Sequence, residues 1–339
     1  MLLDLFLWAV LTGFTLFSAG HALLNKRDPR AALIWIVLCF SLPGVGAASY
    51  WILGVNRIRT RARGWQEEGR GLPDLTPAYC DWSPEKSSIL PFRSENFAGQ
   101  LNLVDHVTRR PLVPGNFLQP LHDGEEAFPA MLNAIAGSKE TICLSTYIFE
   151  SNETGRRFTD ALIRAAERGV EVRVLIDALG ERYSFPSIRR LFRGSRVKVG
   201  RFLPPSLLGR GIFFNLRNHR KILVVDGNLG FVGGMNIGDR HLVDLEDNPR
   251  RVSDIHFAVF GPVIGHLEDA FNEDWHFATG EEPPARTSKE LPPFGEAFAR
   301  GISAGPNEEH EKLQWIIVGA LNCARHSIRI MTPYFIPDR

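Results

Sequence analysis

The sequence predicts an α/β protein in which a layered domain of sheet and helices follows a two-helix transmembrane hairpin. Two apolar segments of 23 residues each, Leu2–Leu24 and Ala31–Leu53, open the chain. Strand-like and helix-like segments then alternate, which is typical of layered α/β domains. Asp226-Gly227 stands between two apolar runs, a strong hairpin pattern. The length of 339 residues is compatible with about two domains.

Each apolar segment is long enough to cross a hydrocarbon core of about 30 Å, which takes about 20 helical residues. Asp4 is the only Asp, Glu, Lys or Arg residue in either segment. The first segment has no Lys or Arg before its apolar stretch, and a second apolar segment follows at once. These two features favour a retained anchor over a cleaved signal peptide. Pro43, Gly44 and Gly46 allow the second segment to kink, or to enter the membrane and return.

Basic residues on the two flanks predict the orientation. Three of them, Lys26, Arg27 and Arg30, lie between the apolar segments, and four arginines lie in the range Arg57–Arg63. The positive-inside tendency therefore favours a multi-pass protein of the inner (plasma) membrane whose main body is cytoplasmic.

The overall composition excludes some classes of protein. The formal net charge of +1 gives no general attraction to nucleic acid, so no nucleic-acid partner is expected. The four cysteines show no ligand spacing, which argues against a disulfide framework or a zinc site. No cofactor is expected.

The body of the chain divides into regions by composition. Residues 57–114 are expected to form a basic flank and connector after a transmembrane hairpin at 1–56. A first domain spans 115–280, a linker 281–306, and the start of a second domain 307–339. The expected strands are Asn116–Leu121, Thr141–Phe149, Val170–Asp177, Lys221–Val225 and Leu229–Val232. The expected helices are Glu125–Ala136, Thr154–Arg168 and Pro262–Phe277.

Candidate chemistry concentrates in the stretch Asn218–Asn236, NHRKILVVDGNLGFVGGMN. Residues two apart on a strand share a face, so His219 and Lys221 are expected to point the same way. A group that titrates near pH 7 then lies beside a cation, which suits a phosphate ester. Asp226 is a weaker candidate site residue on physical grounds. It falls on the opposite face of the strand from Lys221, and an Asp-Gly pair is also typical of an ordinary turn.

Three residues after the hairpin are candidates for a phosphate pocket. Gly233 and Gly234 allow a ligand to approach the backbone closely, and Asn236 can donate a hydrogen bond to an oxyanion. An ordinary surface strand with a Gly-Gly turn is the alternative interpretation.

The pattern His219-x-Lys221-x4-Asp226-x6-Gly233-Gly234-x-Asn236 resembles the HKD signature of the phospholipase D superfamily. The amino-acid sequence of this stretch is most similar to the first HKD repeat of bacterial cardiolipin synthases. The similarity extends to TYIF at Thr146–Phe149, RGVEVRVLID at Arg168–Asp177 and TPYFIPD at Thr332–Asp338.

The resemblance implies a phospholipase D-like sheet-and-helix fold, with two HKD halves facing each other across one metal-free active site. It implies that His219 is the nucleophile and forms a phosphohistidine, and that Lys221 holds the phosphate oxygens. Asp226 would help to orient the site. The implied substrates are phosphatidylglycerol and other phospholipids, and the implied product is cardiolipin. One local departure is Val252-Ser253-Asp254-Ile255-His256, which keeps an Asp and a His but lacks the family's aromatic residue and Arg.

An internal repeat is expected near the end of the chain. Asn307–Arg325 is helix-like and Ser327–Phe335 is strand-like, and an offset of 186 residues superposes them on the earlier helix and strand. At this offset Ile142 falls on Ile328 and Leu144 on Ile330. The counterpart of His219 would lie near position 405, beyond Arg339. The interpretation is a second domain that has only begun, so that a second HKD half, from a missing part or another chain, is needed.

Two other functions remain open: a phosphodiesterase or nuclease that pairs two single-HKD chains, and a catalytically incomplete membrane protein. A metal site is a further alternative, because one predicted helix carries two His and two Asp. A solvated helix face is the favoured interpretation of these four residues. They are His266, Asp269, Asp274 and His276.

Overall fold

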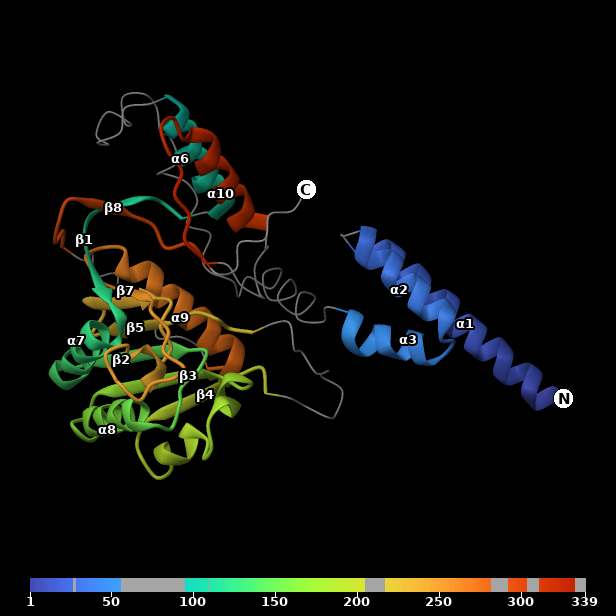
Figure 1. The fold of residues 1–339 in the computed structure, drawn as a ribbon, viewed down its shortest axis with the longest axis horizontal. Helices are drawn as coiled ribbons and strands as arrows, with labels where there is room; N and C mark the ends of the chain where they lie inside the picture. The colour runs from blue at the N-terminus through green and yellow to red at the C-terminus, as the bar shows by residue number, and fades with distance from the viewer. Residues whose placement is uncertain are drawn as a thin grey trace.

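The computed structural model describes residues 1–26, 29–55, 95–108, 110–204, 217–281, 292–303 and 311–332 (Figure 1). The α-helices are α1 (Leu2–Asn25), α2 (Pro29–Ser41), α3 (Val45–Ser49), α6 (Glu95–Thr108), α7 (Asp123–Gly137), α8 (Glu153–Glu167), α9 (Ile264–Thr279) and α10 (Glu311–Cys323). The strands are β1 (Val113–His122), β2 (Thr141–Thr146), β3 (Glu171–Asp177), β4 (Lys198–Phe202), β5 (Ile222–Val225), β6 (Leu229–Gly233), β7 (Ile255–Phe260) and β8 (Ala297–Ala299).

The strands form one eight-stranded sheet in the order β4-β3-β2-β5-β6-β7-β1-β8. β2, β3 and β4 are parallel, whereas β5 runs antiparallel to β2 and begins the antiparallel half. β5 pairs with β6 from Ile222↔Val232 to Val225↔Leu229, so the predicted hairpin is confirmed. The prediction of a layered α/β domain is confirmed as well.

Helices cover both faces of this sheet, with α7 and α8 on one face and α9 on the other (Figure 1). Alternation along a strand sends successive side chains to opposite faces. Leu144 of β2 therefore packs with the α7/α8 core, while its neighbour Cys143 packs with the α9 core. Central strands buried on both faces read as continuous apolar runs, which explains VLI at 174–176 of β3 and ILVV in β5.

Several strands begin or end along the same border of the sheet, where it is bounded by strand ends and not by an outermost strand. We call this border the sheet edge. β2 and β3 end there, and β5 starts there because it is antiparallel to β2 with Ser145 opposite Ile222. β6 ends and β7 begins at the same edge, where Gly233 lies opposite His256. Loops that precede and follow these strands thus converge on the start of β5.

The transmembrane hairpin is shown only in part. α1 matches the first apolar segment, and it is the one helix among the described residues that is long and apolar enough to cross a bilayer. The second apolar segment is broken: α2 ends at Ser41, and α3 is followed by a π-helix at Tyr50–Gly54. The predicted kink is confirmed, because Pro43 lacks an N–H group and Gly44 adopts a φ of 81°.

Two short elements lie where a connector and a linker were expected. α6 falls in the connector and packs along α10, where Gln100 Nε2 donates to the Ile316 carbonyl at 2.9 Å. β8 falls in the expected linker and pairs with β1, so that β8 is the last strand on that side of the sheet. Weak periodicity therefore did not mean absence of structure in these two stretches.

The helix predicted at Asn307–Arg325 is confirmed as α10, but the strand predicted after it is not. α10 ends at Cys323, 186 residues after the end of α7, but the described residues 327–332 form no strand. β2 lies between β3 and β5, and its Ile142 and Leu144 are 0% and 1% exposed. At equivalent positions Ile328 and Ile330 are 55% and 51% exposed. The strand prediction was wrong over these residues because no described strand pairs with them; 333–335 lie outside the described residues.

Candidate active site

The segment that carries His219 is anchored by the end of a strand and by a helix. Residues 217–221 run without regular structure into β5. The backbone N–H of Asn218 donates to Asp177 Oδ2, at the end of β3, over 3.1 Å. Its side-chain Nδ2 donates to Asp274 Oδ2, on α9, over 2.7 Å. The segment is therefore held at the residue immediately before His219.

Asp274 holds a second point of the same segment. The guanidinium of Arg220 pairs with Asp274 Oδ1, and the backbone N–H of Arg220 donates to the Asn218 side-chain oxygen at 2.9 Å. Asn218 is buried, whereas His219 is exposed. Anchoring on one side thus leaves the imidazole free to face outward from the sheet edge.

The prediction that two His and two Asp form a solvated face of α9 was wrong, because all four are buried. Asp274 is 1% exposed and serves the anchor just described, and Asp269 lies 3.7 Å from the guanidinium of Arg110. His266 accepts the N–H of Gly301, and His276 contacts the carbonyl of Glu281. Among the described residues, no group of three or more His, Cys, Asp or Glu is placed to hold a metal ion.

His219 and Lys221 meet at the ring of Tyr147, which follows β2. The imidazole stacks on this ring with centroids 4.1 Å apart and an interplanar angle of 21°. The Lys221 Nζ lies 5.6 Å from the same ring centroid and donates to the His219 carbonyl at 2.7 Å. The structure therefore brings the two predicted residues together and adds a third, Tyr147. Tyr147 lies inside the TYIF run, but the strand pattern alone does not distinguish a site residue from a buried core residue there.

The electrostatics of this cluster favour a neutral imidazole next to a cation. Burial lowers the pKa of His219, and the positive charge of Lys221 lowers it further, while Asp177 opposes the shift. Burial lowers the pKa of Lys221 to about 8, partly opposed by Asp254. At pH 7 the imidazole can act as a nucleophile while most of the lysine remains charged.

Asp254 and His256, at the start of β7, flank the cluster. Burial, followed by repulsion from His241 and Lys221, lowers the pKa of His256 to about 4. A Cβ atom on Gly233 would collide with His256, and one on Gly234 would collide with the Asp254 carboxylate. The Gly-Gly pair therefore lets β7 and its polar side chains come close, a role that the sequence interpretation did not foresee.

Asn236 connects the loop after β6 to the end of β2. Its side-chain oxygen accepts the backbone N–H of Ile148 at 2.9 Å, and its own N–H donates to His241 Nε2 at 3.2 Å. Ile237 extends this contact through a parallel bridge to Phe149. Asn236 thus stabilises the backbone next to Tyr147.

Asp226 lies at the opposite end of β5 from His219. Its carboxylate accepts the backbone N–H groups of Lys139, Glu140 and Thr141 at 2.9, 2.8 and 2.9 Å. The residue adopts a φ of 50°, in the left-handed region that Asp tolerates. The structure therefore does not bring Asp226 to the predicted nucleophile.

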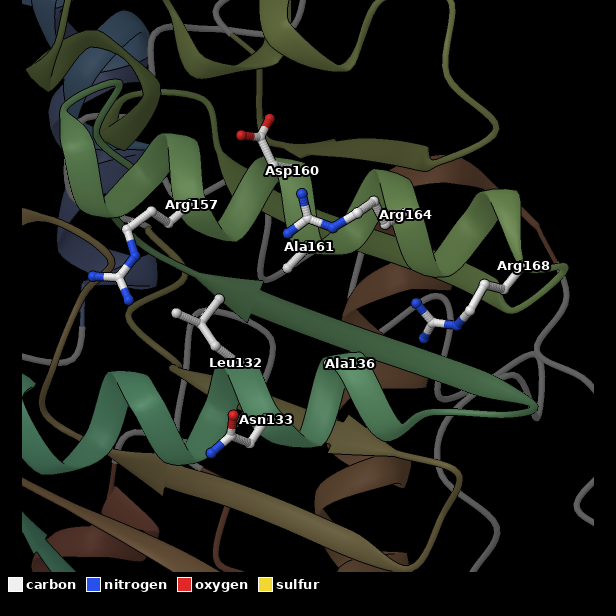
Figure 2. Close-up of a pocket in the computed structure, with 8 residues that line it drawn as sticks. All are labelled: Leu132, Asn133, Ala136, Arg157, Asp160, Ala161, Arg164 and Arg168. Atoms are coloured by element: carbon white, nitrogen blue, oxygen red, sulfur yellow. The ribbon is translucent and has the colours of Figure 1, made fainter.

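A separate hollow of about 310 Å³ lies between α7 and α8 (Figure 2). Its polar lining includes Arg157, Asp160 and Arg164 of α8 and Arg168, which follows the last residue of that helix, and all four are exposed. The Arg168 guanidinium donates to the carbonyls of Ile135 and Ser138, at the C-terminus of α7. Since cations are favourable at a helix C-terminus, this arginine stabilises the helix pair. None of the residues that line the hollow belongs to the cluster around His219.

The comparisons with known proteins cover this domain and most of the chain. Residues 131–275 match the family described as "Cardiolipin synthase, PLD-like domain". "Cardiolipin synthase A" of Pseudomonas fluorescens is 31% identical over 98% of this chain and 69% of its own length. "Cardiolipin synthase A" of Pseudomonas aeruginosa is 31% identical over 95% of this chain and 65% of its own length. Among solved structures, the phospholipase D family member Nuc from Salmonella typhimurium gives a TM-score of 0.37 at 17% identity, covering 50% of this chain and 99% of Nuc.

The matched domain is that of the phospholipase D superfamily, whose signature His219 and Lys221 fit. The chain belongs to the cardiolipin synthase family within that superfamily. The predictions of the family, of a phospholipase D-like fold and of a phosphatidyltransferase class of enzyme are confirmed. The chain spans about two thirds of the length of these curated relatives.

Proposed function

We propose that this protein is a membrane-bound phosphatidyltransferase that makes cardiolipin from phosphatidylglycerol through a phosphohistidine at His219. One observation carries the proposal: the imidazole of His219 and the ammonium of Lys221 meet at one outward-facing point of the sheet edge. Membership of the cardiolipin synthase family supports the choice of lipid.

The chemistry divides into two displacements at one phosphorus atom. A neutral imidazole nitrogen of His219 attacks the phosphorus of phosphatidylglycerol, the P–O bond to the headgroup glycerol breaks, and the glycerol oxygen takes a proton from water as glycerol leaves. A hydroxyl of a second phosphatidylglycerol then attacks the phosphorus, gives up its proton to the hydroxide left by the first step, and breaks the P–N bond. Cardiolipin is released and the imidazole is restored. Lys221 stabilises the negative charge on the non-bridging oxygens in both steps.

The remaining predicted residues support the site from a distance in this proposal. Asp226 fixes the β5–β6 hairpin by binding three amides, and Asn236 fixes the backbone after β2. Gly233 and Gly234 leave room for β7, so that Asp254 and His256 border the phosphate pocket.

The site also needs a second HKD half, which further sequence or another chain would supply. The correspondence at 186 residues supports this part of the proposal. α10 matches α7, and the apolar side chains of 327–332 are exposed where those of β2 are buried. Such a segment has the pattern of a central strand whose neighbours come from elsewhere.

The membrane arrangement follows from the substrate. A phosphodiester at the lipid–water boundary is reached most easily by a domain tethered to the bilayer, and α1 has the length and composition of such a tether. We place the broken second segment as the return pass, and the catalytic domain in the cytoplasm. The four arginines in the range Arg57–Arg63 support this orientation.

The test uses membranes from cells that lack other cardiolipin synthases. They would contain this chain, either alone or joined to a second HKD half, and would be supplied with radiolabelled phosphatidylglycerol. We expect His219→Ala to abolish the labelled protein adduct and to reduce cardiolipin and glycerol release by roughly 10⁴-fold or more in the form that is active. The matched control is His106→Ala, at an exposed histidine whose imidazole is hydrogen-bonded to the Asn102 carbonyl of its own helix.

Undiminished cardiolipin synthesis by the His219→Ala form would refute the proposal. Cardiolipin synthesis by the joined form alone would support the need for a second half. Cleavage of DNA without transfer to lipid would instead favour a nuclease.

A further inference from the structure

The ring of Tyr147 contacts both His219 and Lys221. The imidazole stacks on the ring at 4.1 Å, and the ammonium lies 5.6 Å from its centroid, within the range of a cation–π interaction. A stacked ring restricts the rotation of its neighbour about χ2, because tilting the imidazole would lose the face-to-face contact. Neither the HKD spacing nor the family comparison assigns this position a role.

The tyrosine itself is held firmly. It is 9% exposed, and its ring meets the ring of Tyr183 edge to face, with centroids 6.1 Å apart. A Cβ on Gly180 would collide with the Tyr147 carbonyl, so the loop after β3 lies directly against the Tyr147 backbone. Glycine at this position therefore permits the close approach.

One carboxylate connects this loop to the nucleophile. Asp177 Oδ1 accepts the N–H groups of Leu179 and Gly180 at 2.8 and 3.3 Å, and Oδ2 accepts the N–H of Asn218. Asp177 thus fixes the loop that presses on Tyr147 and also the residue that precedes His219. The two stacked rings are set relative to each other by shared backbone contacts, and not only by their own attraction.

We propose that Tyr147 is a positioning residue that fixes the plane of the His219 imidazole, so that one ring nitrogen faces the incoming phosphorus while Lys221 is held beside it. This inference deepens the proposed function and rests on it for the identity of the nucleophile. Misplacement of a reacting group by about 1 Å can cost about a hundredfold in rate, so a role of this kind is measurable.

The stack also shields one face of the imidazole from water. The groups that act on His219 are Lys221 on its own segment, Asp177 on β3, and the Tyr147–Tyr183 pair beside them. Burial is the largest cause of the lowered pKa of His219. Removing the aromatic ring admits water, favours the charged form, and moves this pKa upward toward its ordinary value of about 6.5.

The experiment measures how fast diethyl pyrocarbonate modifies His219 in the intact, detergent-solubilised chain. The reagent reacts with neutral imidazole, and mass spectrometry of the His219 peptide separates this site from the other nine histidines. Rates from pH 5 to 8 would be compared for the wild type, Tyr147→Phe, Tyr147→Leu and Tyr147→Met. Tyr183→Phe serves as a control that removes the neighbouring hydroxyl but keeps both rings.

We expect Tyr147→Leu and Tyr147→Met to raise the plateau rate several-fold and to shift its pH midpoint upward, whereas Tyr147→Phe keeps both near the wild type. Cardiolipin formation should fall by about a hundredfold in Leu and Met, and Phe should restore most of it. Thermal unfolding identifies any variant that is not folded. If Tyr147→Leu or Tyr147→Met fails to fold, the other of these two variants provides the test. Equal modification rates and midpoints in the wild type and in the folded Leu or Met variant would overturn the inference. That result is independent of cardiolipin formation by His219→Ala, which tests the proposed function alone.

Discussion

The two ends of β5 are built from the same kinds of groups but serve different purposes. At its start, Asp177 and Asp274 hold the segment before the strand, and His219 is left facing outward. At its end, the Asp226 carboxylate binds three backbone amides of the turn into β2. The start of β5 presents the His219 side chain outward, whereas the Asp226 carboxylate at its end accepts hydrogen bonds from the backbone.

The difference shows that one sequence motif can join chemistry and architecture. His219, Lys221 and Asp226 stand at fixed spacing because β5 connects them, not because they act on the same atom. If so, substitutions at the two ends should separate activity from stability.

Among the residues that support the two ends of β5, the largest effect is expected at Asp274, which belongs to the His219 end. Asp274→Ala removes the partner of Asn218 and Arg220, so the His219 segment loses one of its two anchors. Breaking a buried ion pair costs about 3–5 kcal/mol of stability. In addition, adduct formation per folded molecule should fall by about a hundredfold, since the nucleophile is misplaced. Urea unfolding and labelling with radioactive phosphatidylglycerol measure the two effects.

The matched control is Asp269→Ala on the same helix. Asp269 is also buried and faces an arginine, Arg110, whose guanidinium donates to the His266 carbonyl on the same helix. It should lower stability without lowering the adduct yield per folded molecule. Equal loss of adduct in both variants would mean that α9 matters only for folding, and the anchoring role of Asp274 would be lost.

A smaller effect is expected at the other end of the strand. Asp226→Ala leaves three backbone N–H groups without their carboxylate, and it should lower the free energy of unfolding by about 2–4 kcal/mol. Adduct formation per folded molecule should stay near the wild type, because Asp226 lies at the opposite end of β5 from His219. Asp247→Ala, at an exposed loop aspartate, should change neither quantity. A large loss of adduct in folded Asp226→Ala would erase the distinction between the two ends.

Periodicity predicted most of the fold and the first part of the site. The strands and helices of 115–280 follow from apolar runs whose period switches between two and about 3.6, since this is what a sheet covered by helices requires. His219 and Lys221 follow from their spacing on a strand. These inferences need only local sequence.

Contacts between distant segments could not be predicted in this way. Asp274 reads as solvated on a helix pattern, yet it lies opposite Asn218 and Arg220, which are 56 and 54 residues away in sequence. Tyr147 reads as core, and its role depends on where β5 pairs with β2. The segment 327–332 shows the opposite error: it has a strand's pattern, but the described residues give it no neighbour.

The pH dependence of the adduct tests the His219 end most finely. Protonation removes the nucleophile at low pH, and because the pKa of His219 is lowered, the acid limb should have its midpoint below about 6.5. Loss of the ammonium weakens phosphate binding at high pH, so the alkaline limb should fall near pH 8, the pKa of Lys221. Each limb changes the rate by about tenfold per pH unit beyond its midpoint.

Two variants assign these limbs. Lys221→Arg should abolish the alkaline limb, because a guanidinium keeps its charge far above pH 8, even if the altered geometry lowers the plateau. Asp226→Asn should leave both midpoints in place, since the far end of β5 contributes no titrating group to the site. An alkaline limb that persists in Lys221→Arg would assign it to another group, and a midpoint that moves in Asp226→Asn would show that the two ends of β5 are electrostatically coupled.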